Sequence, residues 1–186
     1  MNRSISNRNI LDEFAIKFCN IVEKYADYII VSGFVAISSG RVRGTEDIDM
    51  IIKPLTKENF RLLHNNLMKN NFVCMQSDSY EEIYSYLSSN LSVRYTYENL
   101  PLPEMEIKFA QDELDNYQLK TRMKLTLTGL DIYFSSINMN IAFKEEYLKS
   151  DKDMEDAKHL RKVYSNIVNE DEINKIKKKI RELRLN

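Results

Sequence analysis

Residues 47–52 read Asp-Ile-Asp-Met-Ile-Ile, and this short segment constrains the fold more than any other. Its apolar residues are typical of a core β-strand, and successive side chains of a strand point to opposite faces. Asp47 and Asp49 therefore share one face, while Ile48 and Met50 share the other. Neighbouring carboxylates repel each other and resist losing water. The segment predicts a sheet with one apolar face and one acidic face that needs a cation.

A second acidic strand is predicted at 105–110, where polar and apolar residues alternate. Glu104, Glu106 and Lys108 share one face of this stretch. If it lies beside 47–52, Glu106 joins the two aspartates in a cluster of three carboxylates. Such a cluster suits Mg²⁺, which prefers hard oxygen ligands. Two such ions, about 4 Å apart, activate an attacking hydroxyl group and stabilise a leaving pyrophosphate.

The acids also have plainer explanations. The aspartate pair fits an edge strand that faces water, or ion pairs with Arg41 and Arg43. Lys108 is able to neutralise Glu106 without any metal. We favour the metal site because the apolar residues of 47–52 indicate a core strand, and charges on a core strand need a partner.

Hydrophobic periodicity and the few chain breakers, four Gly and three Pro, predict the remaining elements. The order predicts an α/β (α+β) fold, with a mixed β-sheet flanked by helices and a C-terminal helical extension. We divide the chain into an α/β core at 1–135 and a helical region at 136–186 that packs as part of the same domain. Strands are expected at 27–32, 47–52, 92–97, 105–110, 123–128 and 131–134, and helices at 10–21, 34–39, from 57, at 80–87 and from 136 onward, the last of them lined by Ile173, Ile176, Ile180 and Leu183.

Charge and composition exclude several classes of protein. The net charge of -1 argues against a protein that coats nucleic acid by bulk charge, although a local basic patch is compatible with it. No apolar run has the length of a membrane span, and the N-terminus lacks the apolar middle of a signal peptide. We therefore expect a soluble, cytoplasmic protein without a membrane partner. Cys19 and Cys74 are interpreted as reduced core thiols, and His64 and His159 as surface residues.

The spacing of these motifs resembles a known family. Ser32-Gly33, a short helix and then Asp47-Ile48-Asp49 resemble the signature of the DNA polymerase β-like nucleotidyltransferase superfamily. The stretch Arg43-Gly44-Thr45-Glu46-Asp47-Ile48-Asp49 is similar to the Arg-x-Thr-x-Asp-x-Asp motif of the abortive-infection nucleotidyltransferase toxins of the AbiEii type and their uncharacterised relatives. The later segment FKEEYLKSDKDMEDAKHL resembles their C-terminal motif, a helical Lys followed by Lys-Asp-x-x-Asp, with Lys144, Lys152, Asp153 and Asp156 at the matching positions. Ser32 stands where the superfamily usually has Gly, and Glu106 where Asp is more common.

The resemblance implies a nucleotidyltransferase fold and a Mg²⁺-dependent enzyme. Such an enzyme transfers a nucleoside monophosphate from an NTP to an acceptor hydroxyl group and releases pyrophosphate. Two Mg²⁺ ions are expected, held by catalytic residues at Asp47, Asp49 and Glu106. The residues expected to contact the nucleotide are Ser32, Gly33, Arg41, Arg43, Lys144 and Asp153.

The acceptor and several roles stay open at this level. An RNA acceptor such as a tRNA 3′ end, a protein side chain and a small molecule are all compatible with the resemblance, and a cognate antitoxin is a possible partner. Ser32 and Gly33 also fit an ordinary turn, Arg41 and Arg43 fit loop arginines in water, and Lys144 fits an exposed helix lysine. Asp153 also fits a helix-capping acid. The alternative function is a non-catalytic nucleotide-sensing or partner-binding module that has kept the fold.

Overall fold

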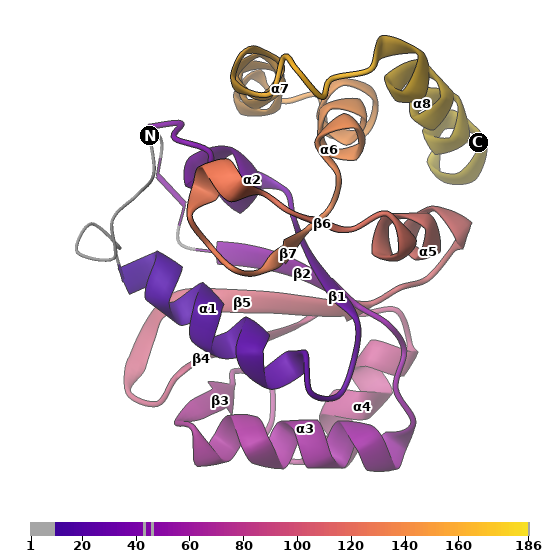
Figure 1. The fold of residues 1–186 in the computed structure, drawn as a ribbon. Coiled ribbons are helices and arrows are strands. Elements are labelled where there is room, and N and C mark those ends of the chain that lie inside the picture. The colour runs from indigo at the N-terminus through magenta and orange to yellow at the C-terminus, as the bar shows by residue number, and fades with distance from the viewer. Residues whose placement is uncertain (1–9, 43, 46, 186) are drawn as a thin grey trace.

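The computed structural model describes residues 10–42, 44–45 and 47–185, and within them seven strands form one mixed sheet (Figure 1). The spatial order is β3-β4-β5-β2-β1-β7-β6. β2 pairs in parallel with β5, and β1 with β7, whereas the other pairs are antiparallel. The strands are β1 (Tyr28–Val31), β2 (Asp47–Ile52), β3 (Phe72–Cys74), β4 (Val93–Tyr97), β5 (Leu100–Phe109), β6 (Met123–Lys124) and β7 (Tyr133–Phe134).

Helices lie on both sides of this sheet (Figure 1). Three of them, α1 (Ile10–Val22), α3 (Lys57–Lys69) and α4 (Tyr80–Ser88), gather on one side. The helices of the other side are α2 (Gly33–Ser38), α5 (Glu113–Lys120), α6 (Ile137–Phe143), α7 (Asp151–Val163) and α8 (Glu170–Arg184). The fold class predicted from the sequence is confirmed, because a mixed sheet flanked by helices is what the chain forms.

The two faces of β2 differ as the alternation of its residues predicts. Ile48, Met50 and Ile52 are fully or almost fully buried in a core that includes aromatic residues of α1 and α3. On the opposite face Asp47 is exposed and Asp49 is partly exposed. Burial of the apolar face fixes the register of the strand, because a slip of one residue would exchange the two faces.

Some predicted elements are wrong in extent. The stretch expected as a strand at 123–128 pairs only at Met123–Lys124 and then forms a 3₁₀ turn at Thr126–Thr128. The Thr128 hydroxyl group donates to the carbonyl of Leu125, and such local bonds compete with pairing between strands. The strand expected at 131–134 is likewise shorter and begins at Tyr133.

The C-terminal helices follow the prediction more closely. Ser150 and Asn169 accept hydrogen bonds from the backbone three residues later, and they begin α7 and α8 as capping residues do. Ile173, Ile176 and Ile180 form the buried face of α8. Leu183, expected on this face, is instead exposed, because it lies on the last turn of the helix.

The interpretation of the histidines as surface residues is wrong. His64 is buried beside the apolar stripe of α3, and its Nδ1 lies 2.8 Å from the hydroxyl oxygen of Tyr95. Burial lowers the pKa of its imidazole. His159 is partly buried, with Nε2 3.1 Å from the carbonyl oxygen of Ser39. Cys19 and Cys74 are buried and free, as predicted.

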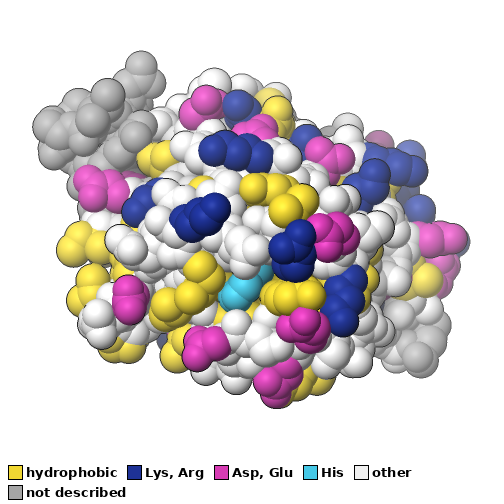
Figure 2. Space-filling view, turned by 90° about the horizontal axis from the view of Figure 1, so that it is seen from below, with side chains coloured by type: hydrophobic (Ala, Val, Ile, Leu, Met, Phe, Trp, Pro, Cys, Tyr) yellow, Lys and Arg dark blue, Asp and Glu magenta, His cyan; other side chains and the backbone are white. Residues whose placement is uncertain are grey.

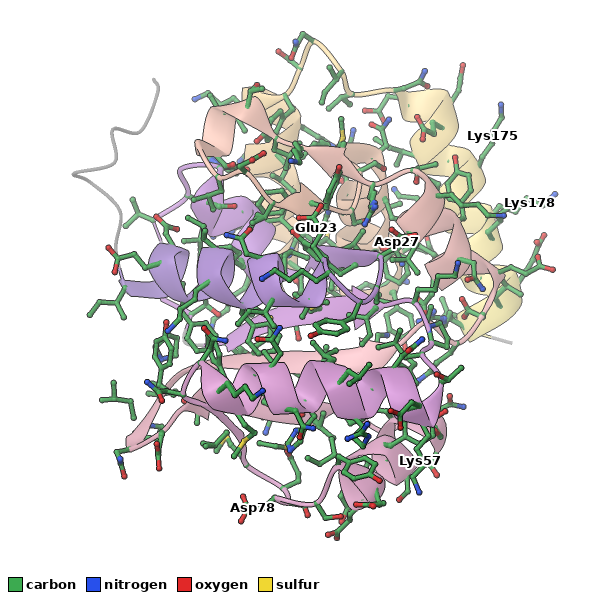
Figure 3. All side chains as sticks on the ribbon, turned by 60° about the horizontal axis from the view of Figure 1, so that its bottom comes forward. Glu23, Asp27, Lys57, Asp78, Lys175 and Lys178 are labelled. Atoms are coloured by element: carbon green, nitrogen blue, oxygen red, sulfur yellow. The ribbon has the colours of Figure 1, made fainter. Side chains whose placement is uncertain are left out.

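The outer surface shows no concentration of one charge on the side that α3 and α4 cover. Basic and acidic side chains are interspersed there, with apolar side chains between them (Figure 2). On α8, Lys175 and Lys178 extend away from the rest of the molecule (Figure 3). Lys177, between them, pairs with Glu145 at 2.7 Å. In the described residues, no helix is long and apolar enough to cross a membrane.

The buried contact between His64 and Tyr95 generates a prediction about stability. Tyr95→Phe keeps the ring but leaves Nδ1 of His64 without its hydroxyl partner, so the free energy of unfolding should fall by about 1–2 kcal/mol. Urea unfolding measures this change. Tyr97→Phe is the matched control, since the Tyr97 hydroxyl group makes no hydrogen bond to the described residues and its ring is half-buried. Equal losses in the two variants would contradict the prediction.

Candidate active site

Four carboxylates lie on one face of two neighbouring strands. The parallel register of β2 and β5 sets Asp47 beside Glu104 and Asp49 beside Glu106. Residues that are directly opposite on paired strands have side chains on the same face, and like charges in such positions are destabilising. Glu106 thus lies on the same sheet face as the two aspartates, where the sequence placed it. The face needs positive charge to offset these acids.

Arg94 on β4 supplies that charge to the two glutamates. It is the cross-strand neighbour of Glu106, and its Nη2 lies 2.8 Å from Glu106 Oε2. Its Nε donates to the same oxygen at 3.0 Å and lies 3.2 Å from Glu104 Oε1. Our sequence reasoning missed Arg94. Alternation along 93–97 was the available signal, because it sets Arg94 on the polar face of its strand.

The aspartate pair has hydroxyl groups as partners instead of an arginine. Thr45 Oγ1 donates to Asp47 Oδ1 at 2.7 Å, and the Ser32 hydroxyl group bonds to the carboxylate of Asp49. Burial raises the pKa of Asp49 from its ordinary 3.8 to about 6. The Ser32 bond and the positive charge of Lys108 oppose this shift, while the charges of Asp47 and Glu106 add to it. Burial thus disfavours the charged form of Asp49, and a cation bound beside it would favour that form.

Ser32 joins β1 to α2 in a conformation that favours glycine. Its φ is 66° and its ψ is -136°, a region that side chains with a Cβ rarely adopt. Such strain persists where the surrounding structure enforces it. Here β1 ends at Val31 beside Asp49, and the buried Gly33 begins α2 one residue later. The side chain of Ser32 does not cap α2, since it bonds to Asp49.

A cavity of about 210 Å³ opens beside these residues. Its floor is the acidic face of the sheet, and its other walls come from α5, α6, the π-helical turn Lys144–Leu148 and the end of α8. The volume lies below the roughly 300–1,000 Å³ of pockets for drug-sized ligands, so it suits part of a larger substrate. The polar and aromatic residues that line the cavity include Ser32, Asp49, Glu106, Asn140, Lys144 and Tyr147.

Lys144 is buried rather than exposed, so its interpretation as an exposed helix lysine is wrong. Its side chain is 1% exposed, and its Nζ lies 2.8 Å from Asp156 Oδ2 and 3.2 Å from Asp153 Oδ1. Lys144 lines the cavity, and its ammonium group is bound by Asp153 and Asp156 of α7.

Arg41 belongs to the same network. Its Nη1 donates to the buried carboxylate of Asp156 and, at 3.0 Å, to the carbonyl of Lys152. Arg41 therefore contacts Asp156, the partner of Lys144, and Asp153 contacts Lys144 itself. Neither Arg41 nor Asp153 lines the cavity. Asp153 also accepts from the Ser150 hydroxyl at 2.5 Å, as a residue of the α7 cap. Arg43, also expected to contact a nucleotide, lies outside the described residues.

The donor set tests whether Mg²⁺ fits. Asp47 and Asp49 offer hard oxygen ligands from one face, and the uncompensated charge of Asp49 favours a cation. These two residues fit the ion in chemistry and placement. Glu106 is bound to Arg94, and across residues 10–42, 44–45 and 47–185 no three acid, His or Cys side chains converge as a metal site. The three carboxylates expected to form the cluster thus share one sheet face, but they do not converge on a common point.

Comparisons with known proteins place the fold. No family model matches the sequence, and no curated protein matches it either. Among solved structures, the chain is similar to an antigenic nucleotidyltransferase-like protein from Paracoccidioides brasiliensis, with 19% identity and a TM-score of 0.55 over 94% of this chain and 88% of that one. It is also similar to the antibiotic-resistance factor ANT(2'')-Ia, with 12% identity and a TM-score of 0.52 over 92% and 93% of the two chains. The chain therefore has the nucleotidyltransferase fold.

The strained turn generates the first prediction for this site. Ser32→Ala removes the hydroxyl group and keeps the unfavourable φ, whereas Ser32→Gly removes both the hydroxyl group and the strain. The Gly variant should therefore be more stable than the Ala variant by about 1 kcal/mol. Chemical denaturation of the two variants at the same pH measures the difference. A more stable Ala variant would show that the turn carries no strain.

The raised pKa of Asp49 generates the second. Between pH 3.8 and 6 the folded state holds a proton on Asp49 that the unfolded state has lost, so stability falls as pH rises through this window. Asp49→Asn lacks this dependence. Relative to that variant, the wild type should lose up to about 3 kcal/mol between pH 4 and pH 7 without divalent ions. Urea unfolding across this range tests the claim, and parallel pH profiles for the two proteins would contradict it.

Proposed function

We propose that the protein is a Mg²⁺-dependent nucleotidyltransferase that transfers a nucleoside monophosphate from an NTP to an acceptor hydroxyl group and releases pyrophosphate. The observation that carries the proposal is Asp49, which lines a cavity on this fold, shares a face of β2 with Asp47 and has a pKa raised by burial. Arg94 pairs with both glutamates beside them, whereas the hydrogen bonds to the aspartates come from the hydroxyl groups of Thr45 and Ser32, and Lys108 offsets only part of the rise in the pKa of Asp49. A cation that arrives with the substrate supplies the missing charge.

The cavity gives the nucleoside end of the NTP a place to bind. Phe143, Tyr147 and Leu148 supply apolar and aromatic wall, on which a base can stack. Asn140 donates its amide hydrogens to two backbone carbonyls, at 2.9 and 3.0 Å, which fixes the side chain and leaves its carbonyl oxygen to accept from the base. The small volume of the cavity does not hold a whole NTP, so the triphosphate would lie at its Ser32 and Asp49 side and extend out of it.

The triphosphate would run past the turn at Ser32 and Gly33. The first backbone N–H groups of α2 are not capped by the Ser32 side chain, so they are suited to phosphate oxygens. Lys144 contributes a buried positive charge at the cavity wall. Arg41 acts through Asp156, which it shares with Lys144, and Asp153 steadies Lys144 in the same way. The role of Arg43 follows from the sequence motif alone.

The reaction would depend on positioning and charge more than on covalent chemistry. Asp47 and Asp49 would hold Mg²⁺, which when bound neutralises the triphosphate and stabilises the leaving pyrophosphate. Glu106 lies beside Asp49 on the neighbouring strand β5, where it could accept the proton of the acceptor hydroxyl group. Release from Arg94 would precede this step.

The motif from Arg43 to Asp49 supports a narrower proposal, a relative of the AbiEii-type toxins with a tRNA 3′ end as acceptor and a cognate antitoxin as partner. A protein or small-molecule acceptor is the other outcome. One observation favours the non-catalytic alternative, a nucleotide-sensing or partner-binding module: Glu106, the expected third acid, is engaged by Arg94.

A labelling experiment tests the proposal. The protein is incubated with each α-³²P-labelled NTP, Mg²⁺ and separate fractions of cellular RNA, protein and small molecules. Transfer of label to one fraction is expected, with complete loss in EDTA and recovery on adding Mg²⁺. Asp49→Asn should lower the rate by at least about a hundredfold, since a transition-state charge would lose its stabilisation.

Two controls separate chemistry from folding. Asp78→Asn removes an equivalent charge from an exposed loop before α4 and should leave the rate unchanged (Figure 3). A thermal melt of Asp49→Asn should show a fold at least as stable as the wild type at neutral pH. Binding of an NTP without any transfer would support the non-catalytic module, and full activity in Asp49→Asn would refute the assigned site.

A further inference from the structure

Glu106 and Arg94 form the contact on which this inference rests. Both Arg94 nitrogens, Nε at 3.0 Å and Nη2 at 2.8 Å, donate to the same oxygen of Glu106. The guanidinium group also reaches Glu104 at 3.2 Å. One cation thus serves two glutamates of the acidic face.

The direction of this contact matters. In the sheet, β5 lies between β4 and β2, so Arg94 approaches Glu106 from the side opposite Asp49. The contact therefore holds the carboxylate of Glu106 to a cation that comes from the strand on the far side of β5 from the aspartate pair. It also explains why three acids that share one sheet face do not converge as a metal site in the described part of the chain.

The contact between Arg94 and Glu106 can be broken at little cost in stability. The Arg94 side chain is 46% exposed and that of Glu106 is 27% exposed, and exposed ion pairs contribute little to stability. The backbone of Arg94 is held separately, because its N–H donates to Gln76 Oε1 at 2.8 Å. The side chain can therefore leave Glu106 while β4 stays in place.

We infer that Arg94 competes with the divalent metal ion for Glu106 and so controls when the third carboxylate joins the site. Without metal, Arg94 holds Glu106 and limits repulsion among the four acids. With metal at the aspartates, Glu106 turns from Arg94 toward the ion. Arg94 is a positioning residue in this scheme, and the inference rests on the metal role given to Asp47 and Asp49 under the proposed function.

Direct metal binding tests the inference without any activity assay. Mn²⁺ replaces Mg²⁺, and electron paramagnetic resonance of the free ion gives the affinity. Arg94→Met should bind Mn²⁺ about tenfold more tightly than the wild type, since a charge-assisted contact no longer competes. Arg94→Lys, which keeps the charge but not the two-nitrogen contact, should fall between them.

Two further variants separate competition from a general charge effect. Arg61→Met removes an exposed arginine of α3 whose partner, Glu58, lies on the same helix. Arg61 is far from Arg94 in the sequence, so its loss should leave the Mn²⁺ affinity unchanged. In a Glu106→Gln background, Arg94→Met should no longer tighten binding, because the residue for which Arg94 competes is gone.

Each contrary result has a definite meaning. Weaker Mn²⁺ binding in Arg94→Met would overturn the inference, since Arg94 would then orient Glu106 as a ligand. An equal gain with and without Glu106 would overturn it too, as a simple charge effect. Both results leave the proposed function intact when Asp49→Asn still abolishes Mn²⁺ binding. A wild type that binds no Mn²⁺ overturns the inference together with the metal role of the aspartates.

Discussion

Repulsion among four carboxylates on one sheet face is the constraint from which the site follows. The parallel pairing of β2 and β5 forces Asp47, Asp49, Glu104 and Glu106 into two adjacent rows. The chain resolves half of this conflict with Arg94 and leaves the other half open. Asp49 loses water without gaining enough positive charge to offset the loss, which is costly for an acid. The unresolved half is where we expect function.

The turn at Ser32 belongs to the same conflict. The Ser32 hydroxyl group bonds to Asp49, and the backbone of Ser32 is held in a conformation that suits glycine. Strain of this kind concentrates at functional sites, where the surrounding structure enforces it. A serine at this position thus moderates the charge of the aspartate while it narrows the approach to the turn. A glycine at this position would have neither the hydroxyl group that bonds to Asp49 nor a side chain at the turn.

The parts of the fold that were predicted are those with strong local patterns. The alternation of 47–52 gave the faces of β2 correctly, and the capping residues Ser150 and Asn169 gave the starts of α7 and α8. β3 was missed because three residues are too few for a periodic pattern. His64 was misplaced because its partner, Tyr95, is distant in sequence.

The candidate site shows the same division. The sequence motif brought Ser32, Asp49, Glu106 and Lys144 together as candidates, and the structure does line one cavity with them. Their roles in catalysis stay predictions. Arg94 and the enclosure of Lys144 depend on pairings between segments that no local pattern encodes. Sequence reasoning therefore found the acids and missed the groups that regulate their charge.

The shared carboxylate of Asp156 has a consequence for how such a chain can evolve. It joins Arg41, in the segment that leads into β2, to Lys144 and to its own helix α7. Loss of the C-terminal helices would leave Arg41 without this buried partner and would remove Lys144 altogether. The acidic strand and the helical tail are thus not interchangeable modules, and recombination between them would have to carry both sides of this contact at once.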